Sequence, residues 1–296
     1  MSVNLEEDLI LQQYIEKAKI LIEALPYIKR FNGITVVIKY GGSALINEEI
    51  KNSVMQDIAL MKFVGFKPVI VHGGGPDINN MLERLDIESH FINGLRVTDD
   101  ETMEVVEMVL AGKINKAMTL ELSQQGIKTV GISGVDGRML EVEKLTPNGN
   151  DLGRVGDIVK VNTELIKSLL DNDFIPVVSP IGFDRNGETY NVNADYAAVA
   201  IAGALNAEKL IFLTDVAGVL QDVNDANSRV SMLSEEGAKD MLENGIISGG
   251  MIPKVECCLA GLASGVQQVH ILDGGMEHCL VLEIFTKDGI GTLFEK

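Results

Sequence analysis

The sequence is poor in cysteine and has no long apolar run. Of its 296 residues only Cys257, Cys258 and Cys279 are cysteines, and their spacing fits neither a zinc site nor a disulfide framework. We therefore expect buried thiols in a reducing compartment. No apolar stretch approaches the length of a membrane span, and the first residues lack a signal-peptide pattern. These absences favour a cytoplasmic protein.

Positive charge is also scarce. Lysine and arginine number 25 against 43 aspartates and glutamates, which gives a formal net charge of -18. Because no local basic stripe interrupts this acidity, we do not expect a nucleic-acid-binding surface. An anionic ligand has to be held by local lysines and backbone dipoles against the field of the whole chain.

Two common nucleotide-binding signatures are missing. No Gly-Lys-Ser or Gly-Lys-Thr occurs, which excludes a Walker phosphate loop. Gly131, Gly134 and Gly137 do not have the spacing of a dinucleotide fingerprint. Residues 138–143 alternate like a strand, so no helix N-terminus follows to receive a pyrophosphate.

Two strand–glycine–helix corners are present instead. An apolar run at 34–38 reads as a buried parallel strand and leads into Lys39-Tyr40-Gly41-Gly42-Ser43. A second strand at 68–72 leads into Gly73-Gly74-Gly75-Pro76, whose proline suits the first turn of a helix. The carboxyl edge of an open α/β sheet is where ligands bind, although each corner alone also fits a plain turn. At 46% hydrophobic and 23% charged residues, the chain forms one large α/β domain or two lobes.

Further elements follow from periodicity and caps. Residues 5–29 carry one apolar helical face, and Pro26 is expected to bend or break that helix near its end. This helix either folds back on its own core or packs on another subunit. The other expected elements are a helix at 48–63 capped by Asn47, a hairpin at Asn93-Gly94, a helical stretch at 98–125, a helix at 194–205 capped by Asn193, and core strands at 174–178, 209–214 and 268–272, the last being the final clear core strand.

Four polar features have a structural and a functional interpretation. Arg96 is either a solvated strand arginine or a bidentate clamp for a carboxylate. Asp195 either complements a helix dipole or orients nearby lysines. Lys254 lies in the first turn of a helix, where a cation is disfavoured unless a phosphate is bound. The loop 214–218 is a tight turn or a cradle for adenine and ribose.

Six motifs occur in a characteristic order: Lys39-Tyr40-Gly41-Gly42, His72-Gly73-Gly74-Gly75-Pro76, Gly94-Leu95-Arg96-Val97-Thr98, Asn191-Val192-Asn193-Ala194-Asp195, Leu213-Thr214-Asp215-Val216 and Gly250-Met251-Ile252-Pro253-Lys254. Together they resemble the amino-acid-kinase superfamily, and within it the N-acetylglutamate kinases of the arginine-sensitive type. The resemblance runs from about residue 34 to the end of the sequence.

The resemblance implies an α/β fold, a three-layer αβα sandwich with a mainly parallel open sheet, preceded by an N-terminal helix. It implies a helical extension at 1–30 for oligomerisation and regulation, and a kinase domain at 31–296. Within that domain, a lobe at about 31–205 would bind the acyl amino acid and a lobe at about 206–296 would bind ATP. The reaction would move the γ-phosphoryl group of ATP to the side-chain carboxylate of N-acetyl-L-glutamate, a step of arginine biosynthesis.

The resemblance also implies roles for individual residues. Lys39 and Lys254 would neutralise the transferring phosphoryl group, and Asp195 would set both lysines. The substrate-binding residues would be Gly41, Gly42, Gly73, Gly74, Arg96, Asn191 and Asn193. The nucleotide-binding residues would be Lys39, Gly41, Thr214, Asp215, Val216, Gly218, Gly250, Met251 and Lys254. Mg²⁺ would be held mainly by phosphate oxygens and water, so no protein metal ligand is assigned.

The chemistry agrees with these roles. A carboxylate is already ionised at neutral pH and needs no general base. The enzyme has to align two anions and spread the developing charge, which cations, backbone donors and Mg²⁺ do. Two alternatives stay open: another carboxylate or phosphate kinase of the same fold, and a non-catalytic sensor of an amino acid or nucleotide. Retention of Lys39, Asp195 and Lys254 together argues against the sensor.

Regulation is expected from the N-terminal helix. Family members with such an extension are arginine-inhibited hexamers built as three dimers. Here Glu283 and the turn around Gly289 and Gly291 resemble the family's arginine pocket, where a carboxylate and backbone carbonyls would meet the ligand. Tyr14 on the helix could complete it. We therefore predict a homohexamer inhibited by L-arginine, and leave open whether a regulatory protein binds.

Overall fold

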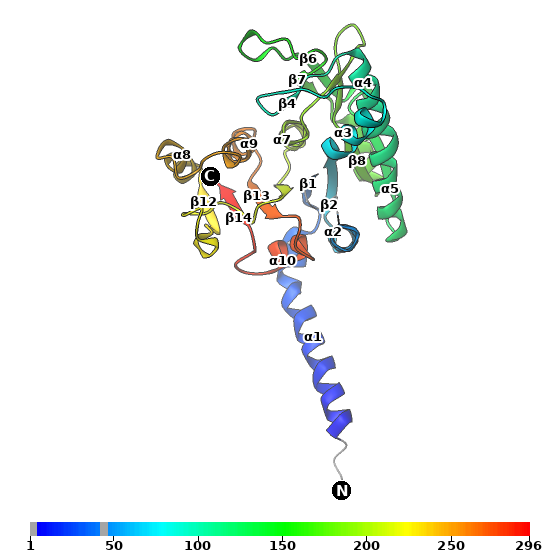
Figure 1. The fold of residues 1–296 in the computed structure, drawn as a ribbon. Helices are drawn as coiled ribbons and strands as arrows, with labels where there is room; N and C mark the ends of the chain where they lie inside the picture. The colour runs from blue at the N-terminus through cyan, green and yellow to red at the C-terminus, as the bar shows by residue number, and fades with distance from the viewer. Residues whose placement is uncertain (1–4, 42–46) are drawn as a thin grey trace.

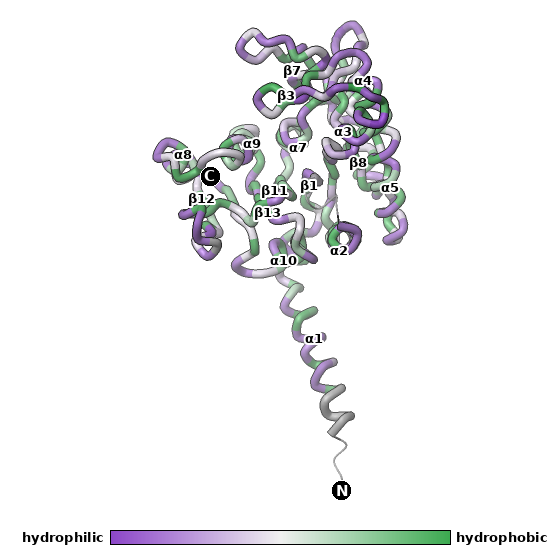
Figure 2. Tube along the Cα trace, viewed as in Figure 1, coloured by the Kyte–Doolittle hydropathy of each residue, from purple (hydrophilic) through white to green (hydrophobic). Residues whose placement is uncertain are grey.

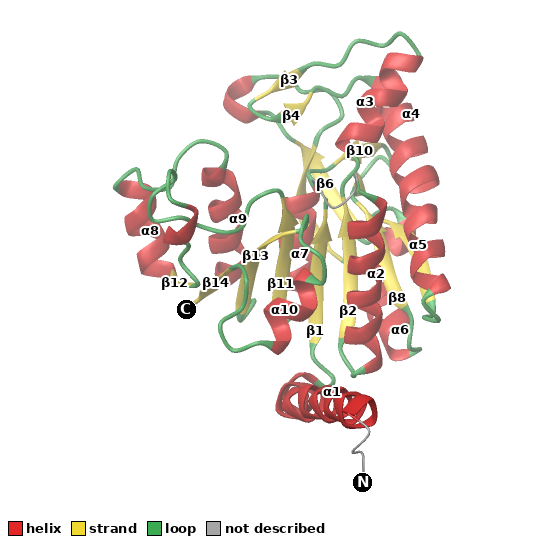
Figure 3. Cartoon of the chain, turned by 60° about the horizontal axis from the view of Figure 1, so that its bottom comes forward, coloured by secondary structure: helices red, strands yellow, loops and turns green. Residues whose placement is uncertain are grey.

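The computed structural model describes residues 5–41 and 47–296. Its centre is an eight-stranded sheet with the order β12-β14-β13-β11-β1-β2-β8-β5. The strands are β1 (Thr35–Tyr40), β2 (Lys67–His72), β5 (Thr129–Ser133), β8 (Ile175–Ser179), β11 (Lys209–Thr214), β12 (Met232–Ser234), β13 (Gln268–Asp273) and β14 (Thr292–Glu295). Every neighbouring pair is parallel except β13 with β14. Helices lie on both sides of this sheet, which confirms the predicted sandwich (Figures 1 and 3).

The two faces of the sheet build two separate cores, because side chains alternate along each strand. Val37 of β1 belongs to one core, and its neighbours Val36 and Ile38 belong to the other. The helices of the first core are α6 (Glu164–Asp171), α7 (Ala194–Leu205), α8 (Glu235–Glu243) and α9 (Met251–Ala263). Those of the second are α2 (Glu48–Phe63), α5 (Asn115–Gln124), α10 (Cys279–Phe285) and the end of α1 (Leu5–Phe31).

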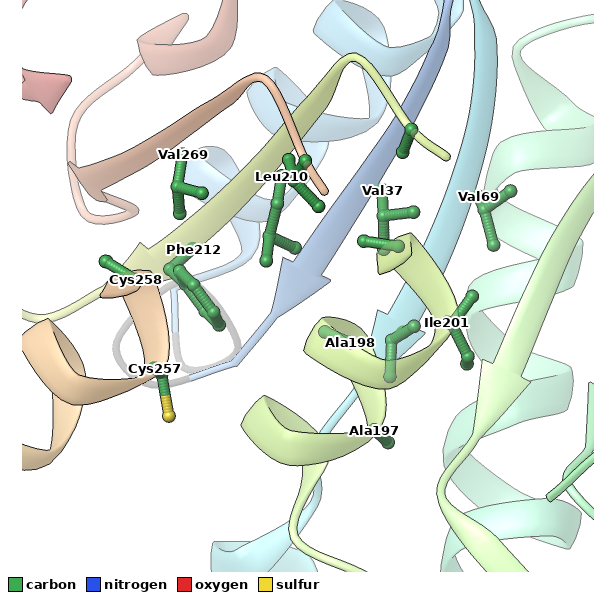
Figure 4. Close-up of a cluster of buried hydrophobic side chains, with 14 of the residues drawn as sticks. Val37, Val69, Ala197, Ala198, Ile201, Leu210, Phe212, Cys257, Cys258 and Val269 are labelled. Carbon is green, nitrogen blue, oxygen red and sulfur yellow. The ribbon is translucent and has the colours of Figure 1, made fainter. Parts of the chain in front are cut away.

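The first core is tightly filled where α7 crosses the sheet. Figure 4 shows Ala197, Ala198 and Ile201 of α7 beside the strand residues Val37 and Leu210. The small alanines let this helix approach the sheet closely. Each fully buried valine, leucine or isoleucine contributes about 1.5–3 kcal/mol. The three cysteines are also buried, as expected from the sequence.

A second, smaller sheet has the order β10-β9-β6-β7, and a two-stranded hairpin stands beside it. The strands are β6 (Leu140–Lys144), β7 (Gly156–Val161), β9 (Ile181–Phe183), β10 (Thr189–Asn191), β3 (Phe91–Ile92) and β4 (Leu95–Arg96). Asn93 and Gly94 join β3 to β4 with φ values of 50° and 79°. A turn of this kind needs positive φ at both central residues, so the predicted hairpin is confirmed.

The predicted helical stretch at 98–125 is present but not uniform. It consists of α4 (Asp100–Glu107), a π-helix η2 (Met108–Ile114) and α5. Asp99 caps it through a 2.8 Å bond from the Thr102 N–H to Asp99 Oδ1. α3 (Gly75–Arg84) packs against this composite helix. The π-helix was not predicted. Three short 3₁₀ turns complete the elements of the described residues: η3 (Asp136–Arg138), η4 (Pro147–Gly149) and η5 (Ala226–Ser228).

Two predicted caps are confirmed by their hydrogen bonds. The Asn47 Oδ1 accepts the Glu49 N–H at 2.9 Å and so begins α2. The Asn193 Oδ1 accepts the Asp195 N–H at 2.8 Å and begins α7. Each bond satisfies a backbone donor that the helix itself cannot use.

Helix α1 (Leu5–Phe31) projects from the body of the molecule (Figures 1 and 3). It continues through Pro26, so of the two outcomes expected from the sequence, a bend or a break, the break does not occur. Contact with the body is made near its end, where Phe31 lies 5.5 Å from Phe66 and Tyr27 lies 6.5 Å from Phe285, ring centroid to ring centroid. The large apolar residues exposed on α1 are Leu11, Tyr14, Ile15, Ile20, Leu21, Ile22 and Leu25. Figure 2 shows green, hydrophobic stretches along this helix. The helix therefore does not fold back on its own core.

The sheet has one strand more than expected after 268–272. β14 inserts between β12 and β13, antiparallel to β13. No helix in the described ranges combines the length and apolarity needed to cross a membrane.

Candidate active site

The carboxyl edge of β1 lies at a topological switch point. β1 has β2, the next strand in the chain, on one side and β11 on the other. Loops that leave such neighbours diverge and open a crevice. Lys39 stands near the end of β1 and Asp215 directly follows β11, so both belong to this edge.

Two lysine–carboxylate pairs lie here. The Lys39 Nζ is 2.9 Å from Asp195 Oδ1, at ion-pair distance but without the orientation of a hydrogen bond. The Lys254 Nζ is 2.6 Å from Asp215 Oδ1. The hydrogen bond from Lys254 is the main cause that lowers the Asp215 pKa, and Lys39 also contributes. The pairs therefore share one electrostatic neighbourhood.

This arrangement differs in part from the sequence-based expectation. Asp195 was expected to set both lysines, but among the described residues its ion pair is with Lys39 alone. Lys254, in the first turn of α9, has Asp215 as its partner. A carboxylate at that position offsets the unfavourable interaction between the lysine cation and the positive end of the helix dipole.

The glycine corners bring backbone close to this cluster. A Cβ on Gly41 would lie 2.8 Å from the Lys39 Nζ, and one on Gly74 would lie 2.4 Å from Ile114 Cδ1. The Gly73 N–H already donates to Tyr40 O at 3.0 Å, so it is not available to a ligand as the sequence suggested. The Gly42 prediction falls outside the described residues.

Arg96 is held by uncharged partners in a small cavity. Its guanidinium donates to Asn79 Oδ1 at 2.6 Å and to Ser89 Oγ, and its Cζ lies 4.7 Å from the Phe91 ring centroid. The cavity has a volume of about 180 Å³. It is lined by Gly73, Gly74, Gly75, Ile78, Phe91, Gly94, Leu95, Arg96, Leu110, Val155, Pro180, Asn191, Val192, Asn193 and Ala194.

The environment of Arg96 favours an anionic ligand. Arg96 is only 7% exposed, which excludes a solvated strand arginine. Burial lowers its pKa. Among residues 5–41 and 47–296 no carboxylate forms an ion pair with it. A buried cation without a countercharge is costly, so an anion in the cavity would stabilise it.

Two asparagines face the same cavity. The Asn191 Nδ2 donates to Thr98 Oγ1 at 3.2 Å. Asn193 uses its Oδ1 to cap α7, so only its amide nitrogen is left for a ligand. β10 and the start of α7 thus place both predicted substrate-binding amides at the cavity wall.

A mainly apolar cavity of about 290 Å³ follows β11. It is lined by Val216, Ala217, Gly218, Val219, Leu220, Val223, Ile246, Ile247, Ser248 and Met251. Of the predicted nucleotide-binding residues, Val216, Gly218 and Met251 line it. Thr214 is instead buried, and its Oγ1 accepts the Val216 N–H at 3.1 Å, which shapes the loop. Gly250 begins α9.

A third cavity, of about 380 Å³, lies between the end of α1 and the C-terminal elements. Glu283, Gly289 and Tyr27 line it, together with Lys209 and His270. Tyr14 does not: it is 61% exposed on the projecting part of α1, because the helix leads away from the body. The predicted place of Tyr14 is thus corrected for the single chain.

Glu283 is already engaged within the protein. Its Oε1 lies 2.7 Å from His270 Nδ1, and its Oε2 accepts the Ile290 and Gly291 N–H groups at 2.7 and 2.9 Å. Burial raises the Glu283 pKa, but these hydrogen bonds outweigh it and hold the pKa below its ordinary value. The glycine turn therefore points N–H donors at the carboxylate, where carbonyls for a ligand were expected. Burial lowers the Lys209 pKa to about 8.

Several residues of these sites were not predicted. Asn79 and Ser89 hold Arg96, while Val223 and Ile246 line the apolar cavity. Each comes from a segment without a motif, so only tertiary structure reveals it. Within the described ranges, no group of three His, Cys, Asp or Glu side chains is placed to hold a metal ion.

Comparison with known proteins identifies the family. The model of the amino acid kinase family matches residues 35–273. The chain belongs to the amino acid kinase family. This kinase is 57% identical over 282 residues to the acetylglutamate kinase of Thermoanaerobacter sp. (strain X514), covering 95% of this chain and 94% of that one. It is 53% identical over 291 residues to the acetylglutamate kinase of Heliobacterium modesticaldum, covering 95% and 99%.

Solved structures place this amino acid kinase among similar folds. N-acetylglutamate synthase from Neisseria gonorrhoeae, complexed with coenzyme A and N-acetyl-glutamate, has a TM-score of 0.83 and 27% identity. The match covers 94% of this chain and 63% of the synthase, which is therefore the longer protein. Carbamate kinase from Giardia lamblia bound to AMP-PNP has a TM-score of 0.68 at 16% identity, covering 89% and 99%, and shares the fold.

Proposed function

We propose that this kinase transfers the γ-phosphoryl group of ATP to the side-chain carboxylate of N-acetyl-L-glutamate, which forms N-acetyl-L-glutamyl 5-phosphate. The observation that carries the proposal is the 57% identity, over nearly the whole chain, to relatives named acetylglutamate kinase. The cavity around Arg96 supports it. A buried guanidinium that pairs with no carboxylate of the described residues suits a small dicarboxylic acyl amino acid.

The reaction needs charge stabilisation rather than proton transfer. The acceptor carboxylate is ionised, and two anions must approach in line. Lys39 and Lys254 supply cations at the mouth of the crevice, and their partners Asp195 and Asp215 hold the ammonium groups in place. Donors fixed before the reaction spend no reorganisation energy during it.

The two substrates approach from different cavities. Arg96 would take the α-carboxylate of the acyl amino acid, with Asn191 on its body. The apolar cavity at 216–251 would take the adenine ring of ATP. Mg²⁺ would neutralise phosphate charge and be held mainly by phosphate oxygens and water.

The test is a direct assay. Purified protein should release ADP and form a hydroxylamine-trappable acyl phosphate only when N-acetyl-L-glutamate and MgATP are both present. Unacetylated glutamate is the matched control, and equal turnover with it would refute the substrate assignment. Turnover only with aspartate or carbamate would favour another kinase of the same fold, and binding without ADP release would favour a sensor.

We also propose arginine control in a hexamer of three dimers. The exposed apolar residues of α1 support an assembly role, since a monomer gains nothing from them in water. The cavity of about 380 Å³ at the base of α1 contains Glu283 and the Gly289 turn. A guanidinium or amino group of L-arginine bound there would sense the position of α1 through Tyr27.

A further inference from the structure

His72 is a buried titratable residue that the proposed reaction does not use. It ends β2, is 0% exposed, and stands directly before Gly73. Its Nδ1 lies 2.9 Å from Gly73 O, and its Nε2 lies 3.2 Å from Asn115 Nδ2. Which nitrogen carries the proton decides what His72 does.

Asn115 settles the proton position. Its Nδ2 lies 2.8 Å from Val177 O and 3.2 Å from Ile132 O, and backbone carbonyls can only accept. Its Oδ1 accepts from Lys116 Nζ at 3.1 Å. The amide nitrogen has two hydrogens: one goes to Val177 O, and the other is shared between Ile132 O and His72 Nε2, both 3.2 Å away. An amide nitrogen cannot accept, so Nε2 is unprotonated. The proton is on Nδ1, which donates to Gly73 O.

This bond fixes the direction of one peptide. In a planar trans peptide the C=O and the N–H point to opposite sides. With the Gly73 O held on the His72 ring, the Gly74 N–H points away from it. Gly74 is buried, and no acceptor within residues 5–41 and 47–296 receives this N–H. Gly73 and Gly74 line the cavity that contains Arg96.

We propose that His72, held by Asn115, is a positioning residue that locks the Gly73–Gly74 peptide so that the Gly74 N–H donates to an anionic oxygen of the transferring phosphoryl group. This deepens the proposed function and rests on it. An unpaired buried donor costs free energy until an acceptor arrives. A donor aimed in advance at developing charge is the usual device of phosphoryl-transfer sites.

The surroundings keep the imidazole in one form. Burial, with the Lys116 cation contributing, lowers the His72 pKa to about 4, so the ring is neutral at pH 7. The ring therefore serves as a fixed donor to Gly73 and not as an acid or base.

Two substitutions separate positioning from core filling. The amide nitrogen of asparagine stands near the Nδ1 position of histidine, and that of glutamine stands near Nε2. His72→Asn should keep the bond to Gly73 O and retain kcat within about threefold, whereas His72→Gln should lose kcat by about 100-fold, the scale for one lost preorganised donor. The KM values for both substrates should stay within about threefold in each variant, because the N–H acts on the transition state. Equal losses in the two variants, or a loss in KM alone, would overturn the proposal.

A measurement on the unmodified protein covers the case in which a variant does not fold. Nitrogen-15 NMR of the ring-labelled protein at pH 7 should show a protonated Nδ1 and an unprotonated Nε2 for His72. A protonated Nε2 would overturn the proposal whatever the variants do. This readout needs no substrate, so it stays informative if the acetylglutamate assay fails. Failure of the His72 proposal can therefore be distinguished from failure of the proposed kinase reaction.

Discussion

Lys39 and Lys254 are held with different strength, although they serve one edge of the sheet. The Lys39 side chain is 14% exposed and its partner Asp195 is 32% exposed, whereas Lys254 is 26% exposed and Asp215 is 67% exposed. The pair at β1 is therefore less screened by water than the pair at α9. We expect Lys39 to be the more rigid donor.

Removal of either lysine should cut turnover. Lys39→Ala and Lys254→Ala should each lower kcat by about 100-fold or more, because a cation aimed at transition-state charge is lost. Asp195→Ala should affect kcat through Lys39, so Lys39→Ala combined with Asp195→Ala should lose less than the product of the two single losses. Steady-state kinetics of these four variants and the unsubstituted protein measures this, and near-normal turnover in Lys39→Ala would refute the role.

Arg96 should act on binding instead. Arg96→Ala should raise the KM for N-acetyl-L-glutamate by roughly 10- to 100-fold, because a charged hydrogen bond contributes about 1.5–3 kcal/mol. The KM for ATP should stay unchanged. Arg185, an exposed arginine paired with Glu143, provides the control as Arg185→Ala. An unchanged KM for the acyl amino acid would remove Arg96 from the substrate site.

Stability should depend on pH through His72. Its pKa falls from the ordinary 6.5 to about 4 on folding, so between these values the unfolded chain binds a proton that the folded chain does not. Lowering the pH from about 6.5 to 4 should therefore decrease the free energy of unfolding, by roughly 3 kcal/mol at about 1.4 kcal/mol per pKa unit.

Urea unfolding at several pH values measures this decrease. The buried His270 contributes to the dependence of the unfolding free energy on pH in every variant. The slope of this dependence is therefore compared between variants. The slope should be shallower in His72→Asn than in the unsubstituted protein. His90→Asn, at a histidine with a 68% exposed side chain, should leave the slope unchanged. Parallel slopes for His72→Asn and the unsubstituted protein would contradict the shifted pKa.

At the level of elements, the sequence predicts what local chemistry decides. The caps at Asn47 and Asn193 and the turn at Asn93-Gly94 follow from side-chain hydrogen bonding and positive φ, and all three are confirmed. The π-helix η2 could not be predicted, because the apolar spacing of one turn fits an α-helix equally well. β14 was missed since four residues carry too little periodicity.

The same limit applies to the site. Lys39, Arg96 and Lys254 were found because each stands in a motif next to a glycine or a strand end. Their partners depend on tertiary structure: Asp215 rather than Asp195 meets Lys254, and Asn79 reaches Arg96 from another helix. Motifs thus predict the charges of a site better than the pairing between them.

For the whole molecule, the projecting α1 is the feature a monomer least explains. Deleting residues 1–25 should convert a hexamer into an active dimer with a weakened response to L-arginine, because the exposed apolar face is removed while Tyr27 and the cavity remain. Light scattering of both forms, with activity measured with and without arginine, tests this. A full-length dimer whose activity does not change with millimolar-scale arginine would refute the regulatory proposal. The kinase assignment would be unaffected.

The position of β14 in the sheet has a consequence for the order in which the chain can fold during synthesis. β12 is an edge strand whose sheet neighbour is β14, and because β12 precedes β14 in the chain, it is synthesised before its partner. The Thr292 Oγ1 of β14 accepts the Val219 N–H at 2.8 Å and donates to Val230 O at 2.6 Å, which ties down the loop that lines the apolar cavity. A nascent chain that has not yet reached Thr292 lacks this anchor. If this cavity binds the nucleotide as proposed, truncation before Thr292 should weaken nucleotide binding.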